Sequence, residues 1–259
     1  MNFDPEKKRR LLLAAAIVLI AAGCVYEFFF SGKIGEYPVS ACADAVLSRL
    51  PVSIAAAIIA ALLGYKILCR PSAKSMLAVA PCFVAVILNP PILGLAFGDA
   101  SISYGAWYHY VLFALECALT GLSEELIFRG ILFPALLERM KDGKYKAFTA
   151  TVASSAIFAA IHVVNLLSSS PSAVAMQVGY SFLIGGLCAF AMLKTGNVLV
   201  CAAIHAIFNF TGTLVERLGN GGWGGLPTLA VVLPVALCVA AYVVFSLLKT
   251  PIPADDGQE

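Results

Sequence analysis

The stretch Ser123-Glu124-Glu125-Leu126-Ile127-Phe128-Arg129-Gly130 places two adjacent carboxylates and a guanidinium within a mostly apolar sequence. A charged side chain at bilayer depth costs at least about 2.5 kcal/mol, so it is rare there unless it has a partner and a function. If the stretch is helical, Glu125 and Arg129 lie four residues apart on one face and can form an ion pair. Glu124 is rotated about 100° from Glu125. It therefore needs partners from elsewhere in the chain.

The composition indicates a membrane protein. Of the 259 residues, 61% are hydrophobic and 12% are charged, against about 45–50% and about 25% in soluble domains. We therefore expect an all-α, polytopic membrane helix bundle in which residues 1–259 form a single integral membrane domain. The net charge of +2 gives no indication of a nucleic-acid partner, and the lipid bilayer is the expected environment.

Eight apolar runs approach the length of about 20 residues that a membrane-spanning helix needs. The predicted spans are Leu11–Phe30, Ala45–Leu68, Met76–Phe97, Ala106–Leu137, Ala147–Leu167, Ala173–Leu193, Val198–Val215 and Leu229–Leu248. The fourth run is too long for one straight crossing, so we expect it to tilt or to be buried among other helices. Prolines inside several of the runs predict kinks.

The distribution of Lys and Arg predicts the orientation. Of the 17 basic residues, 13 fall before the first span, in the even-numbered connections or after the last span. The odd-numbered connections hold only Lys33, Arg49 and Arg217, and Arg129 lies within a span. Under the positive-inside rule this alternation places both termini in the cytoplasm. The acidic tail at residues 250–259 is expected to be disordered.

The N-terminus also resembles a signal peptide. The basic run Lys7–Arg10 precedes an apolar segment and then Gly23–Cys24, which faintly resembles a lipoprotein cleavage site. Since the rest of the chain also spans the membrane, we interpret this segment as the first membrane helix. The eight cysteines show no metal-ligand spacing and mostly lie in apolar runs, so we expect packing residues and no disulfide framework.

Three of the predicted spans carry polar side chains that lipid disfavours. They are Glu124, Glu125 and Arg129 in the fourth span, His162 with Asn165 in the fifth, and His205 with Asn209 in the seventh. His205 and Asn209 are four residues apart and share a helix face. The third histidine, His109, lies among aromatic residues typical of a membrane interface, so it is not expected to be catalytic.

Each of these residues has a structural explanation when taken alone. Glu125 and Arg129 can be a structural ion pair, a histidine can be a packing residue, and Asn209 can hydrogen-bond between helices. Together, however, two carboxylates, two imidazoles and an amide form the inventory of a hydrolytic site, and intramembrane ionisable groups are functional candidates. We expect the core catalytic bundle at about residues 106–215.

The same residues resemble the motifs of a known family. Glu-Glu-x-x-x-Arg occurs at residues 124–129, Phe-x-x-x-His at Phe158 and His162, and His-x-x-x-Asn at His205 and Asn209. In this order, over about Ala106–Phe210, the pattern resembles the CPBP family (CAAX protease and bacteriocin-processing, or Abi). The chain looks like a bacterial relative of type II CAAX prenyl endopeptidases.

The resemblance implies an intramembrane endopeptidase with a cavity open toward the cytoplasm. It would hydrolyse a peptide bond near the C-terminus or membrane anchor of a lipid-associated or membrane-embedded peptide or protein, prenylated or otherwise anchored. A bacterial relative would lie in the inner (cell) membrane. Carried over by motif, the catalytic residues are Glu124 as general base, His162 as a water-positioning residue, and His205 with Asn209 as the oxyanion site. The supporting residues are Glu125, Arg129 and Phe158.

Three alternatives stay open at the level of sequence. No cofactor is expected, but Glu124, His162 and His205 also make a His₂Glu set of the kind that binds catalytic zinc. A proton-coupled transporter could use the same buried groups, although no repeat symmetry is seen between the halves. A non-catalytic scaffold or immunity protein is disfavoured by the intact motif set.

Overall fold

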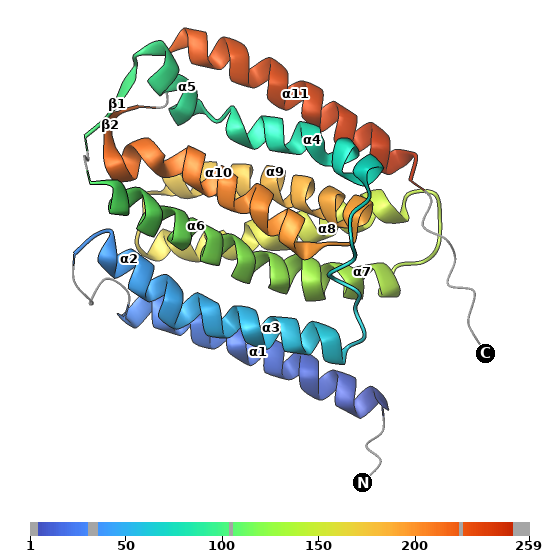
Figure 1. Cartoon of the computed structure of the whole chain (residues 1–259). Coiled ribbons are helices and arrows are strands. Elements are labelled where there is room, and N and C mark those ends of the chain that lie inside the picture. The colour runs from blue at the N-terminus through green and yellow to red at the C-terminus, as the bar shows by residue number, and fades with distance from the viewer. Residues whose placement is uncertain (1–4, 31–35, 104–105, 223–224, 251–259) are drawn as a thin grey trace.

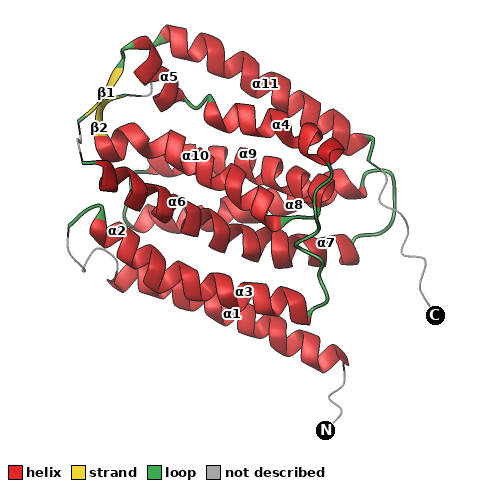
Figure 2. Cartoon of the chain, in the orientation of Figure 1, coloured by secondary structure: helices red, strands yellow, loops and turns green. Residues whose placement is uncertain are grey.

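The computed structural model describes residues 5–30, 36–103, 106–222 and 225–250. Within them the chain is a bundle of helices that run broadly along one common direction (Figure 1), and helices account for nearly all of the regular structure (Figure 2). The label η marks a helical turn of π or 3₁₀ type. The elements in order are α1 (Pro5–Phe30), α2 (Val39–Asp44), η1 (Ala45–Arg49), α3 (Leu50–Leu62), α4 (Ala73–Ile87), α5 (Pro90–Phe97), β1 (Ala100–Ile102), α6 (Trp107–Ile127), η2 (Phe128–Leu132), α7 (Phe133–Arg139), α8 (Lys146–Ile161), η3 (His162–Leu167), α9 (Pro171–Thr195), α10 (Val198–Leu218), β2 (Gly219–Gly221) and α11 (Leu226–Leu248).

The bundle is an all-α polytopic membrane fold, as expected. In the described residues, five helical segments are long and apolar enough to cross a membrane: Val39–Leu62, Lys146–Leu167, Pro171–Thr195, Val198–Leu218 and Leu226–Leu248. A sixth crossing results if α4 and α5, which meet at a 60° bend, count as one broken span. The first and fourth predicted spans are helical but not in this set. The total of eight crossings therefore stays a prediction, as does the cytoplasmic placement of both termini.

The fourth predicted span is a long helix with one wide turn. It continues from α6 through the π-helical turn η2 into α7. Pro134, in the first turn of α7, has no N–H to donate to the carbonyl four residues earlier. The other π-helical turn, η1, likewise lies next to a proline, Pro51 near the start of α3. Both wide turns therefore accommodate a missing backbone donor.

The bend between α4 and α5 is attached to α10. Asn89 precedes Pro90 and is extended, with φ −73° and ψ 148°, as the residue before a proline usually is. Its amide donates to the carbonyl of Phe208 at 3.2 Å. Thr211 donates its hydroxyl to the carbonyl of Val86 at 2.6 Å. Side chains of α10 and the bend therefore satisfy backbone and amide groups that the broken helix exposes.

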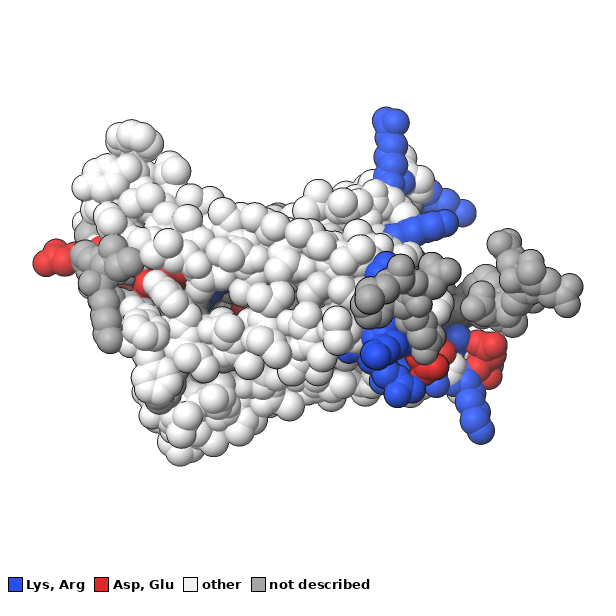
Figure 3. Space-filling view, turned by 90° about the horizontal axis from the view of Figure 1, so that it is seen from below, with Lys and Arg blue, Asp and Glu red and all other residues white. Residues whose placement is uncertain are grey.

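The two ends of the bundle differ in character. At one end β1 and β2 pair antiparallel, with Ala100 opposite Gly221 and Ile102 opposite Gly219, in connections predicted only as loops. At the other end α1 begins and α11 ends (Figure 1), and most of the Lys and Arg side chains visible in Figure 3 gather there. This separation matches the predicted alternation of basic connections. Residues 251–259 of the predicted tail lie outside the described residues.

The seven cysteines whose side chains the structure describes are all free, and five of them are buried. They pack as small apolar residues, in line with the sequence. Cys24 lies within α1, and its side chain is outside the described part.

Candidate active site

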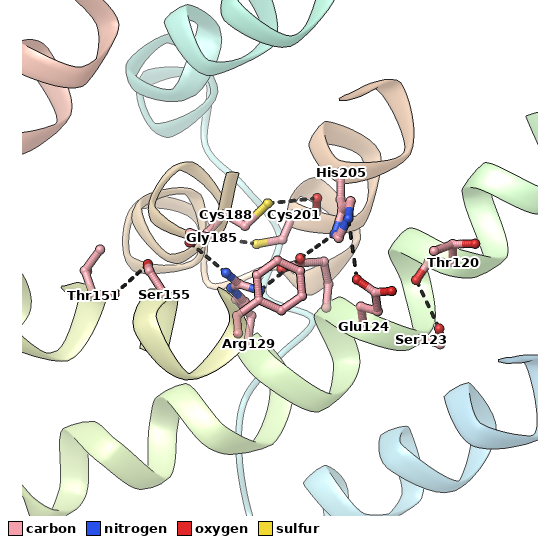
Figure 4. A network of polar contacts seen from close by, with 12 residues as sticks. Thr120, Ser123, Glu124, Arg129, Thr151, Ser155, Gly185, Cys188, Cys201 and His205 are labelled. Carbon is pink, nitrogen blue, oxygen red and sulfur yellow. Dashed lines mark hydrogen bonds and ion pairs between the residues drawn. The ribbon is translucent and has the colours of Figure 1, made fainter. Parts of the chain in front are cut away.

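The site is built where α6 and α10 approach one another most closely. A Cβ placed on Gly121 of α6 would lie 2.9 Å from the carbonyl oxygen of Ala202 and 3.0 Å from the nitrogen of Ala206, both on α10. Only a glycine permits this approach without moving a backbone. One turn later α6 carries the two carboxylates, and α10 carries His205 between these two contact points in sequence. The contact therefore brings the first and third motifs together (Figure 4).

Glu125 and Arg129 form the expected ion pair, fully buried. Arg129 Nη1 donates to Glu125 Oε1 at 3.1 Å, and both side chains are 0% exposed. Arg129 Nη2 also donates to the carbonyl of Gly185 on α9 at 2.7 Å. Its guanidinium carbon lies 4.9 Å from the centre of the Phe158 ring, within the range of a cation–π contact. A charge that would be costly alone in the bundle is therefore compensated from three helices.

Gly185 contacts Arg129 although it belongs to none of the three sequence motifs. A Cβ at this position would lie 3.0 Å from Arg129 Nη2 and 3.1 Å from Ser155 Cα on α8. The lack of a side chain allows α8, α9 and the guanidinium to meet, and the backbone carbonyl becomes a ligand of the arginine. The sequence motifs do not identify this contact, because every residue has a backbone carbonyl.

His205 lies between the two carboxylates. Its Nδ1 is 2.8 Å from Glu125 Oε1, and its Nε2 is 3.6 Å from Glu124 Oε2. The imidazole is almost fully buried, whereas the Glu124 side chain is 28% exposed. An ionised carboxylate only accepts hydrogen bonds, so Nδ1 carries a proton and donates it to Glu125. Glu125 thereby orients the ring so that Nε2 is directed at Glu124.

The second motif reaches the site through an aromatic ring. Phe158 of α8 is 1% exposed, and its ring contacts the imidazole of His205 edge-on at 5.7 Å and that of His162 at 5.1 Å between ring centres. His162 Nδ1 lies 2.9 Å from the Phe158 carbonyl oxygen. Since a carbonyl is only an acceptor, Nδ1 carries the proton and Nε2 is left as an acceptor. His162 is the first residue of the 3₁₀ turn η3, a change of helix type that sequence periodicity did not predict.

Asn209 lies one turn beyond His205 on α10 and is partly buried. Within the described residues its side chain makes no hydrogen bond, and only its carbonyl is used, by Thr213 at 2.8 Å. His109 lies near the start of α6, against Tyr108 at 4.4 Å. Its Cα is about 22 Å along the helix from that of Glu124, at about 1.5 Å per residue. The structure therefore gathers Glu124, Glu125, Arg129, Phe158 and His205 directly, with His162 and Asn209 at the margins.

The zinc alternative requires three ligands around one point. Among the described residues, no group of three or more His, Cys, Asp and Glu side chains could hold a metal ion. Nδ1 of His205 faces Glu125, and Nδ1 of His162 faces a backbone carbonyl. A metal-ligating histidine usually donates its other ring N–H to a carboxylate or a backbone carbonyl, so these two contacts leave both Nε2 atoms available. The zinc alternative with Glu124, His162 and His205 therefore stays a prediction.

A comparison with known protein families finds a similarity over the part of the chain that carries this site. Residues 105–211 match the family model described as type II CAAX prenyl endopeptidase Rce1-like. No curated protein and no solved structure matches the chain. The matched region contains every candidate site residue, all of α6 and α8, and α10 as far as residue 211. Over residues 105–211 this membrane protein is therefore similar to the Rce1-like family of type II CAAX prenyl endopeptidases.

Proposed function

We propose that the protein is an intramembrane endopeptidase that hydrolyses a peptide bond near the C-terminus or membrane anchor of a lipid-associated or membrane-embedded substrate. The observation that carries the proposal is the pair formed by Glu124 and His205. A partly exposed carboxylate faces an oriented imidazole at 3.6 Å, on the two helices that carry the first and third family motifs. This separation leaves both groups within reach of one small reacting group.

Glu124 acts as the general base that takes a proton from the attacking water. Unlike Glu125, it makes no contact with Arg129 in the described residues, so its oxygens are not held by the guanidinium. His162 helps to position the water, because its Nε2 is the acceptor atom left after Nδ1 binds the Phe158 carbonyl. A positioned general base typically contributes about 10²–10⁴-fold to the rate.

His205 and Asn209 stabilise the oxyanion that forms when water adds to the carbonyl. For His205 to donate through Nε2 while Nδ1 faces Glu125, the ring must carry both protons. The site then holds two positively charged side chains, Arg129 and His205. It also holds two negatively charged ones, Glu124 and Glu125, so that the four side chains together carry no net charge. The Asn209 amide donates without adding charge. One oxyanion donor in a water-excluded site is worth about 3 kcal/mol.

The proposed substrate class and membrane location rest on the similarity to the family and on the composition of the chain. The family name supports a prenylated substrate, and the apolar surface of the bundle supports entry of the substrate from the bilayer. We propose the bacterial inner membrane as the location. Protein purified with and without a chelator tests the mechanism: the metal-free proposal expects equal activity and no stoichiometric zinc, and loss of activity restored by zinc would favour the zinc alternative.

The proposal is tested with the protein in lipid nanodiscs. The probe is a library of synthetic peptides that carry a farnesylated cysteine followed by a randomised tail, and mass spectrometry identifies the products. We expect wild type to release short peptides and His205→Phe to release none above background. Glu216→Gln, which alters an exposed carboxylate on α10, is the control and should match wild type. A second library carries an acyl chain in place of the farnesyl group. If wild type cleaves no peptide of either library, the proposed function fails.

A further inference from the structure

The connection between α7 and α8 forms an open hollow at the end of the bundle where α1 begins (Figure 1). Its volume is about 310 Å³, at the lower end of the about 300–1,000 Å³ that ligand pockets occupy. The lining contains three amines, two hydroxyl groups and no carboxylate. The lining residues are Met140, Lys141, Gly143, Lys144, Tyr145, Lys146 and Thr149. This hollow therefore has the chemistry of an anion-binding site.

The positive charge of the hollow is not balanced within the connection. Residues 139–146 contain four basic side chains and a single carboxylate, Asp142. Asp142 is already bound to Lys146, with 2.6 Å between Oδ1 and Nζ. Lys144 lies over the Tyr145 ring, 5.5 Å from its centre. In the described part of the chain neither Lys141 nor Lys144 forms an ion pair, so both ammonium groups are available to an anion.

Lys146 forms one wall of the hollow and begins α8. Its side chain is only 9% exposed, whereas that of Asp142 is 52% exposed, so the wall is held in place. No side chain caps this end of α8. The first N–H groups of a helix have no partner within the helix and carry partial positive charge. They therefore add to the attraction that the lysines exert on an anion, as at other phosphate-binding helix starts.

The connection between α3 and α4 provides a contrast at similar charge. It lies at the same end of the bundle (Figure 1) and, with the first turn of α4, contains Lys66, Arg70 and Lys74. The start of α4 is capped, because the Ser72 hydroxyl accepts a hydrogen bond from the N–H of Ser75 at 3.1 Å. The two connections therefore differ in that only the one before α8 combines available lysines with an uncapped helix start.

We infer that this hollow binds a phosphate group, presented by the headgroup of an anionic phospholipid. Lysine binds phosphate as a point charge, and basic pockets at the ends of membrane helices bind lipid headgroups. Tyr145 is 54% exposed, and an exposed tyrosine at the end of apolar helices is typical of the membrane interface, where lipid phosphates lie. A soluble phosphate has the same chemistry, so the test includes both sources. The inference is independent of the proposed function.

The test titrates the protein, in a neutral detergent, with short-chain phosphatidic acid, and native mass spectrometry counts the bound lipids. Wild type should bind one phosphatidic acid more tightly than it binds phosphatidylcholine of the same chain length. A variant with both Lys141→Gln and Lys144→Gln should lose about tenfold or more in affinity, as expected for two lysines near a lipid phosphate. A variant with both Lys66→Gln and Lys74→Gln removes the same number of exposed lysines at the same end, and it should match wild type.

Thr149→Val separates binding in the hollow from a general attraction between lysines and anionic lipid. It keeps the charge and the shape but removes one lining hydroxyl, so it should weaken binding by about threefold or more. Unchanged binding in Thr149→Val would count against the hollow as the site.

Inorganic phosphate added to the titration identifies the source of the ligand. We expect it not to displace the lipid at a similar concentration, and displacement would make soluble phosphate the ligand of the same site. Equal affinity in wild type and in the variant that lacks Lys141 and Lys144 would overturn the inference, as would an equal loss in the two double variants. None of these results depends on peptide cleavage, so the proposed function is tested separately.

Discussion

At the scale of single residues, the Arg129 guanidinium separates the roles of two neighbouring carboxylates. It holds Glu125 and the Gly185 carbonyl in a region with no solvent exposure, whereas Glu124 lies partly exposed on the adjacent face. Glu125 then binds Nδ1 of His205. Glu125 therefore orients the imidazole ring, and the proposed function assigns the reaction to Glu124. Two neighbouring residues of the same type thus have different surroundings, because only Glu125 is paired with Arg129.

Replacement of Arg129 by methionine should destabilise the protein strongly. It leaves Glu125 as an uncompensated buried charge, and loss of one partner of a buried pair costs about 3–5 kcal/mol. Unfolding in mixed micelles measures the change. Arg10→Gln, which breaks an exposed pair with Glu6, should leave the unfolding curve nearly unchanged. Equal stability of Arg129→Met and wild type would show that the pair does not support the fold.

The tautomer of His162 predicts a difference between two amide substitutions. Its Nδ1 binds the Phe158 carbonyl, so Nε2 is the atom available to water. Glutamine places a polar atom near the Nε2 position and asparagine near the Nδ1 position. His162→Gln should therefore retain at least about tenfold more kcat than His162→Asn, within the about 10²–10⁴-fold range of such groups. A higher kcat for His162→Asn than for His162→Gln would indicate that Nδ1, and not Nε2, positions the water.

At the scale of helices, the contact between α6 and α10 sets the geometry of the site. Gly121→Ala would place a methyl group 2.9 Å from the Ala202 carbonyl oxygen, and backbone atoms cannot give way locally. We expect a loss of about 1–3 kcal/mol in stability, as for other overpacked sites, with a fall in kcat as His205 moves from Glu124. Gly179→Ala in α9 is the matched control, because nothing lies within 4 Å of its Cβ; it should be neutral or stabilising. Full activity in Gly121→Ala would argue against this contact as a determinant of the site.

The sequence predicted those parts of the site that depend on helical spacing. The pairing of Glu125 with Arg129 follows from four-residue periodicity, and the apolar runs predicted the long helices. The sequence did not predict the pairing of β1 with β2, because neither Ala100–Ile102 nor Gly219–Gly221 has the residue pattern of a strand. The Gly185 carbonyl as a ligand of Arg129 was also missed, because every residue has a carbonyl. Such contacts depend on how helices meet in three dimensions, which spacing within one helix does not encode.

At the scale of the whole molecule, the basic end of the bundle should face the cytoplasm. Exposed Cys69 lies in the connection between α3 and α4, which the Lys and Arg count places inside. A membrane-impermeant maleimide should label Cys69 in inverted vesicles and not in intact cells. Asn220→Cys, placed in β2 at the opposite end, should show the reverse pattern. Cys188 is buried, so its labelling would show that the protein has unfolded. Labelling of Cys69 in intact cells would contradict the predicted orientation of the protein in the membrane.

The most direct test of the whole account compares Glu124→Gln, Glu125→Gln and Glu216→Gln for unfolding and for cleavage of the farnesylated peptides. We predict that Glu124→Gln unfolds like wild type but loses at least about 10²-fold in kcat. Glu125→Gln should lose both stability and activity, and Glu216→Gln should lose neither. Cleavage by Glu124→Gln at a rate within about twofold of wild type would contradict the account, because the hydrolytic water would then be activated by another group.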